Sequence, residues 1–187
     1  PLCMDQIGKY EVIKKLGDGA TSEVYLCHDP FNNRDVAVKV VVEERISDTE
    51  SGKLTKKLFI TEASLAGKLL HPHIVQIHDA VVDDKLNYIV MEYVPGGTLE
   101  RFCDPTNLMP IDKIVEIIFK CTRALDFAQK LGVTHRDIKP ANILLSGETD
   151  IKISDFGAAL MTSADMTQVT GIGSPAYMSP QQIKEQP

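Results

Sequence analysis

Two runs in the second half of the chain bring together side chains that can hold a cation and move a proton. The first is His135-Arg136-Asp137-Ile138-Lys139-Pro140-Ala141-Asn142, and the second, Asp155-Phe156-Gly157, follows two short apolar segments. Carboxylate and amide oxygens bind hard divalent cations, and a carboxylate within reach of a hydroxyl serves as a general base. A polar surface loop explains the first run taken alone. Chance does not readily explain both runs at this spacing.

A glycine turn in the first half is a candidate phosphate-binding loop. Gly17-Asp18-Gly19 stands between two β-rich segments, and glycines let backbone N–H groups approach a phosphate closely. An ordinary glycine hairpin explains this turn equally well on its own. Two other nucleotide motifs are excluded. The Gly-Lys-Ser/Thr ending of a Walker loop is absent, and Glu23–His28 is predicted to be a strand where a dinucleotide fingerprint needs a helix.

Lys39 is the third candidate, because it is the single charged residue in the valine-rich part of a predicted strand. A buried ammonium is costly unless it is paired with an anion. Glu62, on the next predicted helix, is the natural partner. The plainer alternatives are an edge-strand lysine that reaches water and a glutamate on a solvent face.

These candidates need elements to position them, and the hydrophobic pattern changes along the chain from strands to helix. The turn Pro95-Gly96-Gly97 marks the change and predicts two parts, residues 1–94 and residues 95–187. Apolar residues that recur at 3.6-residue spacing predict an amphipathic helix in the second part. The predicted elements are strands at Tyr10–Leu16, Glu23–His28 and Asp35–Val42, a polar connection at Glu43–Lys57, a helix to about Leu70, strands at Ile74–Val82 and Leu86–Met91, a helix from Ile111 to about Gly132, and strands at Ile143–Leu145 and Ile151–Ile153.

Composition bounds the class of protein. The 187 residues are 43% hydrophobic and 25% charged, as in soluble globular proteins, and the net charge of −6 argues against a nucleic-acid partner. There is no apolar run long enough to span a membrane, so we expect a cytoplasmic segment, and a membrane anchor in a longer parent chain is left open. The scattered cysteines and the pair His71 and His73 favour packing roles over a metal site.

Taken together, these segments resemble the eukaryotic-type (Hanks-type) protein kinase family, from Leu16 to about Pro180. Val36-Ala37-Val38-Lys39 is similar to the family's Val-Ala-Ile-Lys, and Val90–Gly97 is similar to its hinge. Gly173–Gln182 is most like the bacterial serine/threonine kinases. The resemblance implies an α+β bilobal fold, with an antiparallel-sheet N-lobe that carries one helix and a mainly helical C-lobe.

The same resemblance implies an ATP site. Backbone of Glu92–Val94 would bind the adenine, Met91 would be the gatekeeper, and Lys39, held by Glu62, would contact the α- and β-phosphates. The implied ATP-binding residues are Leu16, Gly17, Gly19, Val24, Ala37, Lys39, Met91, Glu92, Tyr93, Val94 and Leu144.

The resemblance also implies the cofactor and the chemistry. Asn142 and Asp155 would hold Mg²⁺, with Mn²⁺ as an alternative, and Asp137 would orient the hydroxyl of the acceptor. Lys139 favours serine/threonine specificity, so the implied partners are ATP and proteins that bear Ser or Thr. The oligomeric state is left open. The implied catalytic residues are Asp137, Lys139, Lys39 and Glu62, and the candidate activation-loop phosphosites are Thr162, Ser163, Thr167 and Thr170.

The chain departs from the family pattern at several points. Ser22 replaces the third loop glycine, and Gln181 replaces a glutamate that normally forms an ion pair. The chain ends at Pro187, so we expect the later helices to be missing, part of the Ile111–Gly132 apolar stripe to be uncovered, and the chain alone to be marginally stable and poorly active.

Two alternatives to an active kinase fit the sequence less well. A nucleotide-binding pseudokinase or scaffold is disfavoured because the complete set of implied catalytic and metal residues is present. A small-molecule phosphotransferase is disfavoured because Lys139 and Gly173–Pro180 suit a peptide acceptor.

Overall fold

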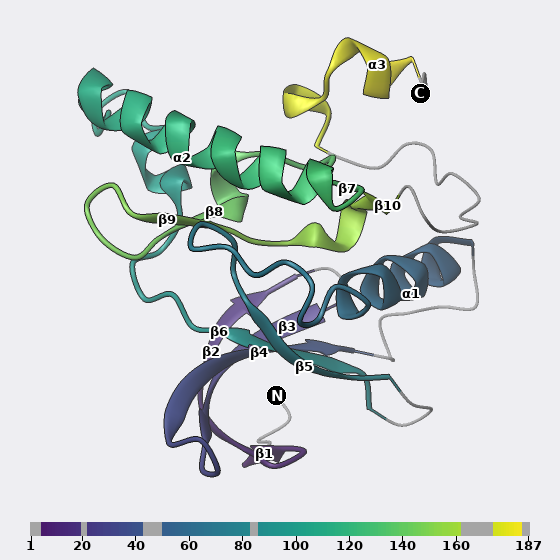
Figure 1. The fold of residues 1–187 in the computed structure, drawn as a ribbon. Helices are drawn as coiled ribbons and strands as arrows, with labels where there is room; N and C mark the ends of the chain where they lie inside the picture. The colour runs from purple at the N-terminus through teal and green to yellow at the C-terminus, as the bar shows by residue number, and fades with distance from the viewer. Residues whose placement is uncertain (1–4, 20–21, 43–49, 83–85, 162–173, 185–187) are drawn as a thin grey trace. The chain divides into compact units, whose positions relative to one another are not determined.

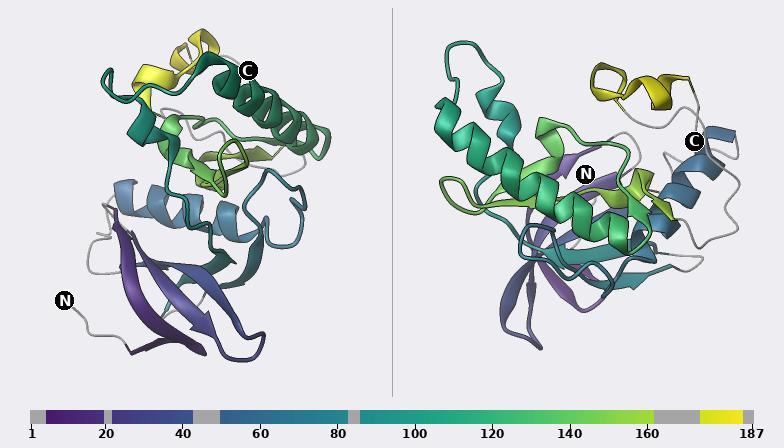
Figure 2. Two further views of the ribbon diagram at one scale, coloured as in Figure 1. Left: turned by 90° about the vertical axis from the view of Figure 1, so that its left-hand side faces the viewer. Right: turned by 45° about the horizontal axis from the view of Figure 1, so that its top comes forward.

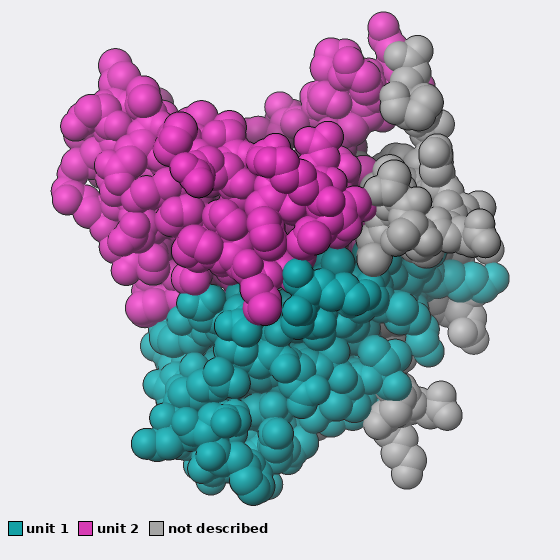
Figure 3. Space-filling view, viewed as in Figure 1, with its two compact units in different colours: residues 1–68, 76–93 teal, residues 69–75, 94–187 magenta. Residues whose placement is uncertain are grey.

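The computed structural model describes residues 5–19, 22–42, 50–82, 86–161 and 174–184 of the chain. The chain forms two compact units, one of Pro1–Lys68 with Gln76–Tyr93 and one of Leu69–Val75 with Val94–Pro187 (Figure 3). The second unit therefore includes a short segment from the first half of the sequence. The division into independent lobes at residues 94 and 95 stays a prediction.

The first unit is built on one antiparallel sheet that curves strongly (Figures 1 and 2). Its strands, in spatial order, are β1 (Gln6–Ile7), β2 (Tyr10–Asp18), β3 (Ser22–Asp29), β4 (Arg34–Val41), β6 (Tyr88–Glu92) and β5 (Ile77–Val81). Register shifts at Val12/Lys14 and Lys15/Gly17 interrupt the β2–β3 ladder, and such bulges increase local twist. The first three predicted strands are confirmed to within two residues.

Strand β4 is the centre of this unit because both of its faces are covered. Val36, Val38 and Val40 face one core cluster, with Tyr88 and Val90. Successive side chains point to opposite faces of a strand, so Ala37, Lys39 and Val41 share the other face. On that face Val41 packs in a second cluster with Phe59, which lies on a helix, and Ile89.

That helix, α1 (Glu50–Ala63), differs from the prediction at both ends. Residues 50–57 are helical, although the sequence predicts a polar connection there because their apolar periodicity is weak. The helix ends well before Leu70. Successive N–H groups shift to 3₁₀-type partners, Leu65 to Glu62 and Ala66 to Ala63, and Gly67 then takes a left-handed φ of 71°.

The predicted strand Ile74–Val82 is also shorter than expected, since β5 begins at Ile77. Ile74 instead forms a parallel bridge with Ile153 in the second unit. Backbone bonds on either side fix this contact, from Val75 N–H to Ile153 O at 2.9 Å and from Ile153 N–H to His73 O at 2.9 Å. Ile74 therefore pairs with β9 of the second unit, although its apolar pattern predicted that it would be part of the strand that became β5.

The second unit is organised around helix α2 (Ile111–Lys130), which lies against β7 and β9 (Figures 1 and 2). Its short strands form two antiparallel pairs, β8 with β9 and β7 with β10. These elements are β7 (Val133–Thr134), β8 (Ile143–Leu145), β9 (Ile151–Ile153), β10 (Leu160–Met161) and the short helix α3 (Pro180–Ile183), with 3₁₀ turns at Leu99–Phe102, Pro140–Asn142, Phe156–Ala158 and Pro175–Tyr177.

Helix α2 confirms the predicted helix, and part of its apolar stripe is uncovered, as expected from the sequence. The buried residues are Ile117, Cys121, Ala124 and Ala128, which recur at helical spacing. Four members of the expected stripe, Ile111, Ile114, Val115 and Ile118, are exposed in the described structure. Apolar residues cover more than one face of this helix, so periodicity alone did not decide which face packs inward. Within the described segments, no helix has the length and apolarity needed to cross a membrane.

Candidate active site

The first unit positions Lys39 toward α1, on the same face of β4 as Ala37 and Val41. Its Nζ donates to Oε2 of Glu62 over 2.7 Å. The Glu62 side chain is only 4% exposed and that of Lys39 is 19% exposed, so solvent screens this ion pair weakly. The predicted pairing is therefore present, and the two alternatives of an edge lysine and a solvent-face glutamate are wrong. An anchored ammonium of this kind is suited to bind phosphate oxygens.

The glycine turn joins β2 to β3, and its backbone is held at one point. The N–H of Gly19 donates to Ser22 O over 2.8 Å, and Gly17 lies opposite Val24 in the ladder. A Cβ added at Gly17 would meet no atom within 4 Å, so this glycine faces open space. Next to the turn, Lys15 forms ion pairs with Asp18 at 2.6 Å and Glu23 at 2.8 Å.

The other predicted adenine-site residues of the first unit lie on β2, β3, β4 and β6 or directly after them. Ala37 is buried and lies opposite Met91 in the β4–β6 ladder, while Leu16 is 40% exposed. The N–H of Glu92 donates to Gln76 O over 2.9 Å, which fixes the start of the predicted hinge. Two further candidates belong to the second unit: Val94, which is buried, and Leu144, which lies on β8 and is half-buried. Their contact with a nucleotide stays a prediction.

In the second unit, two of the predicted site residues, Lys139 and Asn142, contact the carboxylate of Asp137. Lys139 Nζ lies 3.1 Å from Oδ2 of Asp137. Asn142 Nδ2 donates to the same Oδ2 over 3.2 Å and to the Asp137 carbonyl over 2.9 Å. The structure thus brings together Asp137, Lys139 and Asn142, three residues to which the family resemblance gives roles.

Ser174 completes this cluster, and sequence reasoning did not single it out. Its backbone N–H donates to Oδ1 of Asp137 over 3.0 Å, and its hydroxyl accepts from Lys139 Nζ over 2.7 Å. A serine hydroxyl therefore contacts the ammonium beside the Asp137 carboxylate. The only signal in the sequence was the position of Ser174 in the segment that resembles bacterial kinases.

His135 supports the loop from beneath. It is 2% exposed, its Nε2 donates to Ser154 O over 2.9 Å, and its Nδ1 accepts from the Asp137 N–H over 3.1 Å. These bonds require the neutral ring with hydrogen on Nε2. Burial lowers the pKa of His135, which favours the same neutral form. The ring of Phe156 meets it edge to face, with centroids 4.5 Å apart.

Asn142 and Asp155 are suited to hold a divalent cation by their chemistry and their place in the fold. The β8–β9 ladder pairs Ile143 with Ile153, and Ser154 N–H donates to Asn142 O over 2.9 Å, so the two residues stand near the same end of this hairpin. Asp155 is exposed and in the left-handed region at φ 63°. Because Nδ2 of Asn142 donates to Asp137, its carbonyl oxygen is the atom left for a cation. Mg²⁺ commonly takes one or two protein carboxylates or carbonyls together with phosphate oxygens.

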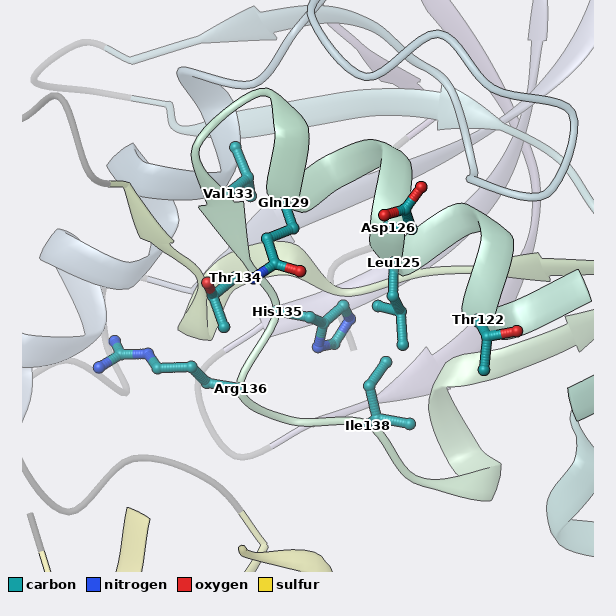
Figure 4. A pocket seen from close by; sticks show the side chains of 9 residues that line it. All are labelled: Thr122, Leu125, Asp126, Gln129, Val133, Thr134, His135, Arg136 and Ile138. Atoms are coloured by element: carbon teal, nitrogen blue, oxygen red, sulfur yellow. The ribbon is translucent and has the colours of Figure 1, made fainter. Parts of the chain in front are cut away.

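A pocket of about 380 Å³ lies on the α2 side of the loop that carries Asp137. Figure 4 shows Leu125 and Ile138 beside the ring of His135, while the Arg136 side chain extends away from them. Asp126 at its rim forms an ion pair with Lys130 at 2.6 Å. Asp137, Asn142 and Asp155 do not line this pocket, so it is separate from the candidate active site.

The remaining candidates have packing roles or lie outside the described residues. His71 Nδ1 accepts from His73 N–H over 3.0 Å, and the His71 ring packs on Phe127. Among the residues that the structure describes, no group of three or more His, Cys, Asp or Glu side chains could hold a metal ion. The four candidate phosphosites, Thr162, Ser163, Thr167 and Thr170, lie in residues 162–173, outside the described segments.

The curved antiparallel sheet with its lysine–glutamate pair, and the loop with its aspartate, lysine and asparagine, define the chain as a protein kinase domain. Residues 10–187 match the model of the protein kinase domain family, and the chain belongs to that family. The predicted family and the α+β fold class are thereby confirmed.

Its curated relatives include bacterial serine/threonine kinases. The chain is 38% identical over 178 residues to a probable serine/threonine-protein kinase of Clostridium acetobutylicum, covering 94% of this chain and 26% of the relative. It is 39% identical to the serine/threonine-protein kinase PknB of Mycobacterium leprae, covering 94% of this chain and 29% of that one. Identity to the serine/threonine-protein kinase PrkC of Bacillus subtilis is 35%, over 95% of this chain and 27% of the relative. The chain thus spans between a quarter and a third of the length of these relatives.

Proposed function

We propose that this domain transfers the γ-phosphate of ATP to a serine or threonine hydroxyl of a protein substrate. The observation that carries the proposal is the cluster in which Asp137 and Lys139 both contact Ser174, with the Ser174 hydroxyl 2.7 Å from Lys139 Nζ. A carboxylate and an ammonium that contact a serine together have the chemistry needed to hold an acceptor alcohol beside a phosphate. The bacterial serine/threonine kinases among the relatives support the same reaction.

The first unit, as we propose, binds ATP through its strands and its glycine turn. Lys39, held by Glu62 at 2.7 Å, contacts the α- and β-phosphates, and the backbone at Gly17 and Gly19 covers them. The space at Gly17 supports this role, because a Cβ placed there would meet no atom of the described residues within 4 Å. The adenine lies against apolar side chains and bonds to backbone. The proposed residues are Leu16, Val24, Ala37, Met91, Glu92, Tyr93 and, from the second unit, Val94 and Leu144.

Asn142 and Asp155 are the proposed ligands of a divalent cation, Mg²⁺ first and Mn²⁺ as an alternative. When bound, the cation neutralises phosphate charge and holds the phosphate oxygens in position. The hydrogen bond from Asn142 Nδ2 to Asp137 supports this assignment, because it orients the amide with its oxygen turned away from Asp137.

In the proposed reaction, the acceptor oxygen attacks the γ-phosphorus and the bond from that phosphorus to the β,γ-bridging oxygen breaks. The hydroxyl proton passes to the carboxylate of Asp137, and ADP leaves with the bonding electron pair. Lys139 offsets charge on the transferred phosphoryl group. The transition state is loose, so positioning and electrostatics supply most of the acceleration, and proton transfer contributes about 10²–10⁴-fold.

Regulation by phosphorylation is part of the proposal. Arg136 precedes Asp137, and burial lowers the pKa of its guanidinium, so a phosphate nearby would stabilise its charged form. The proposed acceptors are Thr162, Ser163, Thr167 and Thr170. We further propose that residues 1–94 and 95–187 act as N-lobe and C-lobe of the kinase, and that it works in the cytoplasm.

The test uses the full-length protein with labelled ATP, Mg²⁺ and a general protein substrate, followed by phosphoamino-acid analysis. Label on serine or threonine is expected, with a loss of at least about 10²-fold in Asp137→Asn and Asp155→Asn. Asp126→Asn, at an exposed site on α2, is the matched control and is expected to keep its activity.

Label transfer that survives both substitutions would overturn the proposal. Binding of ATP without transfer to any protein would instead favour the pseudokinase alternative. Phosphate found only on small molecules would favour a small-molecule phosphotransferase.

A further inference from the structure

The side-chain amide of Gln182, on α3, uses both of its ends. Its Nε2 donates to the backbone carbonyl of Arg136 over 2.7 Å, and its Oε1 accepts from the N–H of Ser179 over 3.2 Å. Ser179 Oγ in turn accepts from the Gln182 N–H over 3.3 Å, which completes a capping box. One side chain therefore closes the start of α3 and reaches the loop that carries Asp137.

The carbonyl that Gln182 contacts belongs to an unusual peptide. Arg136 lies in the left-handed region at φ 67°, which a residue with a Cβ adopts only when its surroundings hold it there. The N–H of the same peptide unit, contributed by Asp137, donates to His135 Nδ1 over 3.1 Å. This peptide plane is thus held at its carbonyl end by Gln182 and at its N–H end by His135.

The orientation of this peptide decides where the Asp137 side chain points, because Cα of Asp137 is the next atom of the chain. The carboxylate of Asp137 has little room to adjust, since it already contacts Lys139 Nζ at 3.1 Å, Asn142 Nδ2 at 3.2 Å and Ser174 N–H at 3.0 Å. A rotation of the peptide plane would disturb all three contacts together.

We propose that Gln182 is a positioning residue, which holds the Arg136–Asp137 peptide so that the Asp137 carboxylate faces the acceptor hydroxyl. This inference rests on the proposed function, because it assumes that Asp137 accepts the hydroxyl proton during phosphate transfer. It also means that the proton acceptor is oriented only when the residues around α3 are folded against the loop.

The position requires an amide and not an acid. A glutamate could still accept from the Ser179 N–H, but it has no donor for the Arg136 carbonyl and would place an oxygen against it. The neighbouring Gln181 has an exposed side chain and provides a matched site for the same change.

The experiment compares Gln182→Glu, Gln182→Met and Gln181→Glu in the full-length protein. Gln182→Glu keeps the cap of α3 and loses the bond to Arg136, whereas Gln182→Met loses both. We expect kcat for phosphate transfer to fall at least tenfold in both Gln182 variants, with KM for ATP within twofold of wild type. Gln181→Glu is expected to keep kcat within twofold or to raise it.

A second measurement does not depend on activity. Amide hydrogen exchange of residues 133–142 is expected to become at least fivefold faster in Gln182→Glu, with a melting temperature close to that of wild type. If Gln182→Glu keeps both wild-type kcat and wild-type exchange while Gln182→Met does not, Gln182 is only a helix cap and the inference is overturned. Loss of kcat together with an equal change in KM and a lowered melting temperature would also overturn it. A wild-type protein that transfers no phosphate would defeat the proposed function, and the exchange measurement alone would then decide this inference.

Discussion

The backbone N–H of Ser174 donates a hydrogen bond to Oδ1 of Asp137 over 3.0 Å, although the two residues are far apart in the sequence. The Ser174 hydroxyl adds a bond from Lys139 at 2.7 Å. Ser174→Ala removes only this second bond and leaves the backbone contact in place. A hydrogen bond to a charged group is worth about 1.5–3 kcal/mol, so we expect a fall in kcat of roughly tenfold or more. Ser174→Thr keeps the hydroxyl and should keep kcat within about threefold, measured as transfer from labelled ATP.

The second prediction concerns the ion pair of Lys39 and Glu62. Lys39→Met removes the ammonium from a glutamate that is 4% exposed, and we expect a loss of transfer of at least about 10²-fold and of about 1–3 kcal/mol in unfolding free energy. The double variant Lys39→Met/Glu62→Leu is expected to regain part of the stability and none of the activity. Urea unfolding and kinase assays on the same preparations would check this. Recovery of activity in the double variant would exclude a role for Lys39 in phosphate binding.

The pair of Lys39 and Glu62 was predictable because a lysine among valines in a buried strand needs an anion, and the charge requirement leaves few partners. The runs around Asp137 and Asp155 could be recognised as candidate site segments, since each concentrates residue types that can hold a cation or move a proton. The early start of α1 was not predictable, because residues 50–57 lack the apolar periodicity that indicates a helix. Ser174 and Gln182 were also missed. A hydroxyl or an amide in a turn-rich segment carries no signal until the fold brings it to its partner.

The third prediction follows from burial of His135. Its folded-state pKa lies below the ordinary 6.5, so the unfolded chain binds a proton first as the pH falls. The free energy of unfolding is therefore expected to decrease from pH 7.5 to pH 5.5, by up to about 1.4 kcal/mol per pH unit for this group. Burial lowers the pKa of His71 and of His78 as well, which adds to the same trend. Urea unfolding at the two pH values measures the change, and His135→Asn should flatten it. An equally steep dependence in that variant would assign the effect to other groups.

The fourth prediction concerns Gly96, where the backbone passes close to β8. A Cβ added there would lie 1.9 Å from the carbonyl oxygen of Leu145, so the backbone at Gly96 and the backbone of β8 would have to move apart. We expect Gly96→Ala to lower the unfolding free energy by about 1–3 kcal/mol. Gly147→Ala is the control, since its Cβ would have only ordinary contacts at 3.6 Å with Asp150. Thermal unfolding of both variants tests this, and equal melting temperatures would contradict it.

The fifth prediction separates the cysteines by reactivity. Burial raises the pKa of Cys27 to about 11 and that of Cys121 to about 11, whereas Cys103 is exposed. The thiolate is the reactive form, so a maleimide at pH 7.5 is expected to modify Cys103 well before Cys27 and Cys121. Peptide mass mapping over a time course measures this order. Early labelling of Cys121 would mean that α2 separates readily from β7 and β9.

The segment Leu69–Val75 joins the later unit although sixty-odd residues of the earlier one precede it and Gln76–Tyr93 follows it. The chain therefore crosses from one unit to the other three times, and no single cut yields two intact halves. If the chain were split after Tyr93, Ile74 would lie on the first fragment and its bridge partner Ile153 on the second. When such fragments reassemble, the bridge between Ile74 and Ile153 has to form again beside the hairpin that precedes Asp155. A probe placed at this bridge would therefore report whether the two fragments have joined.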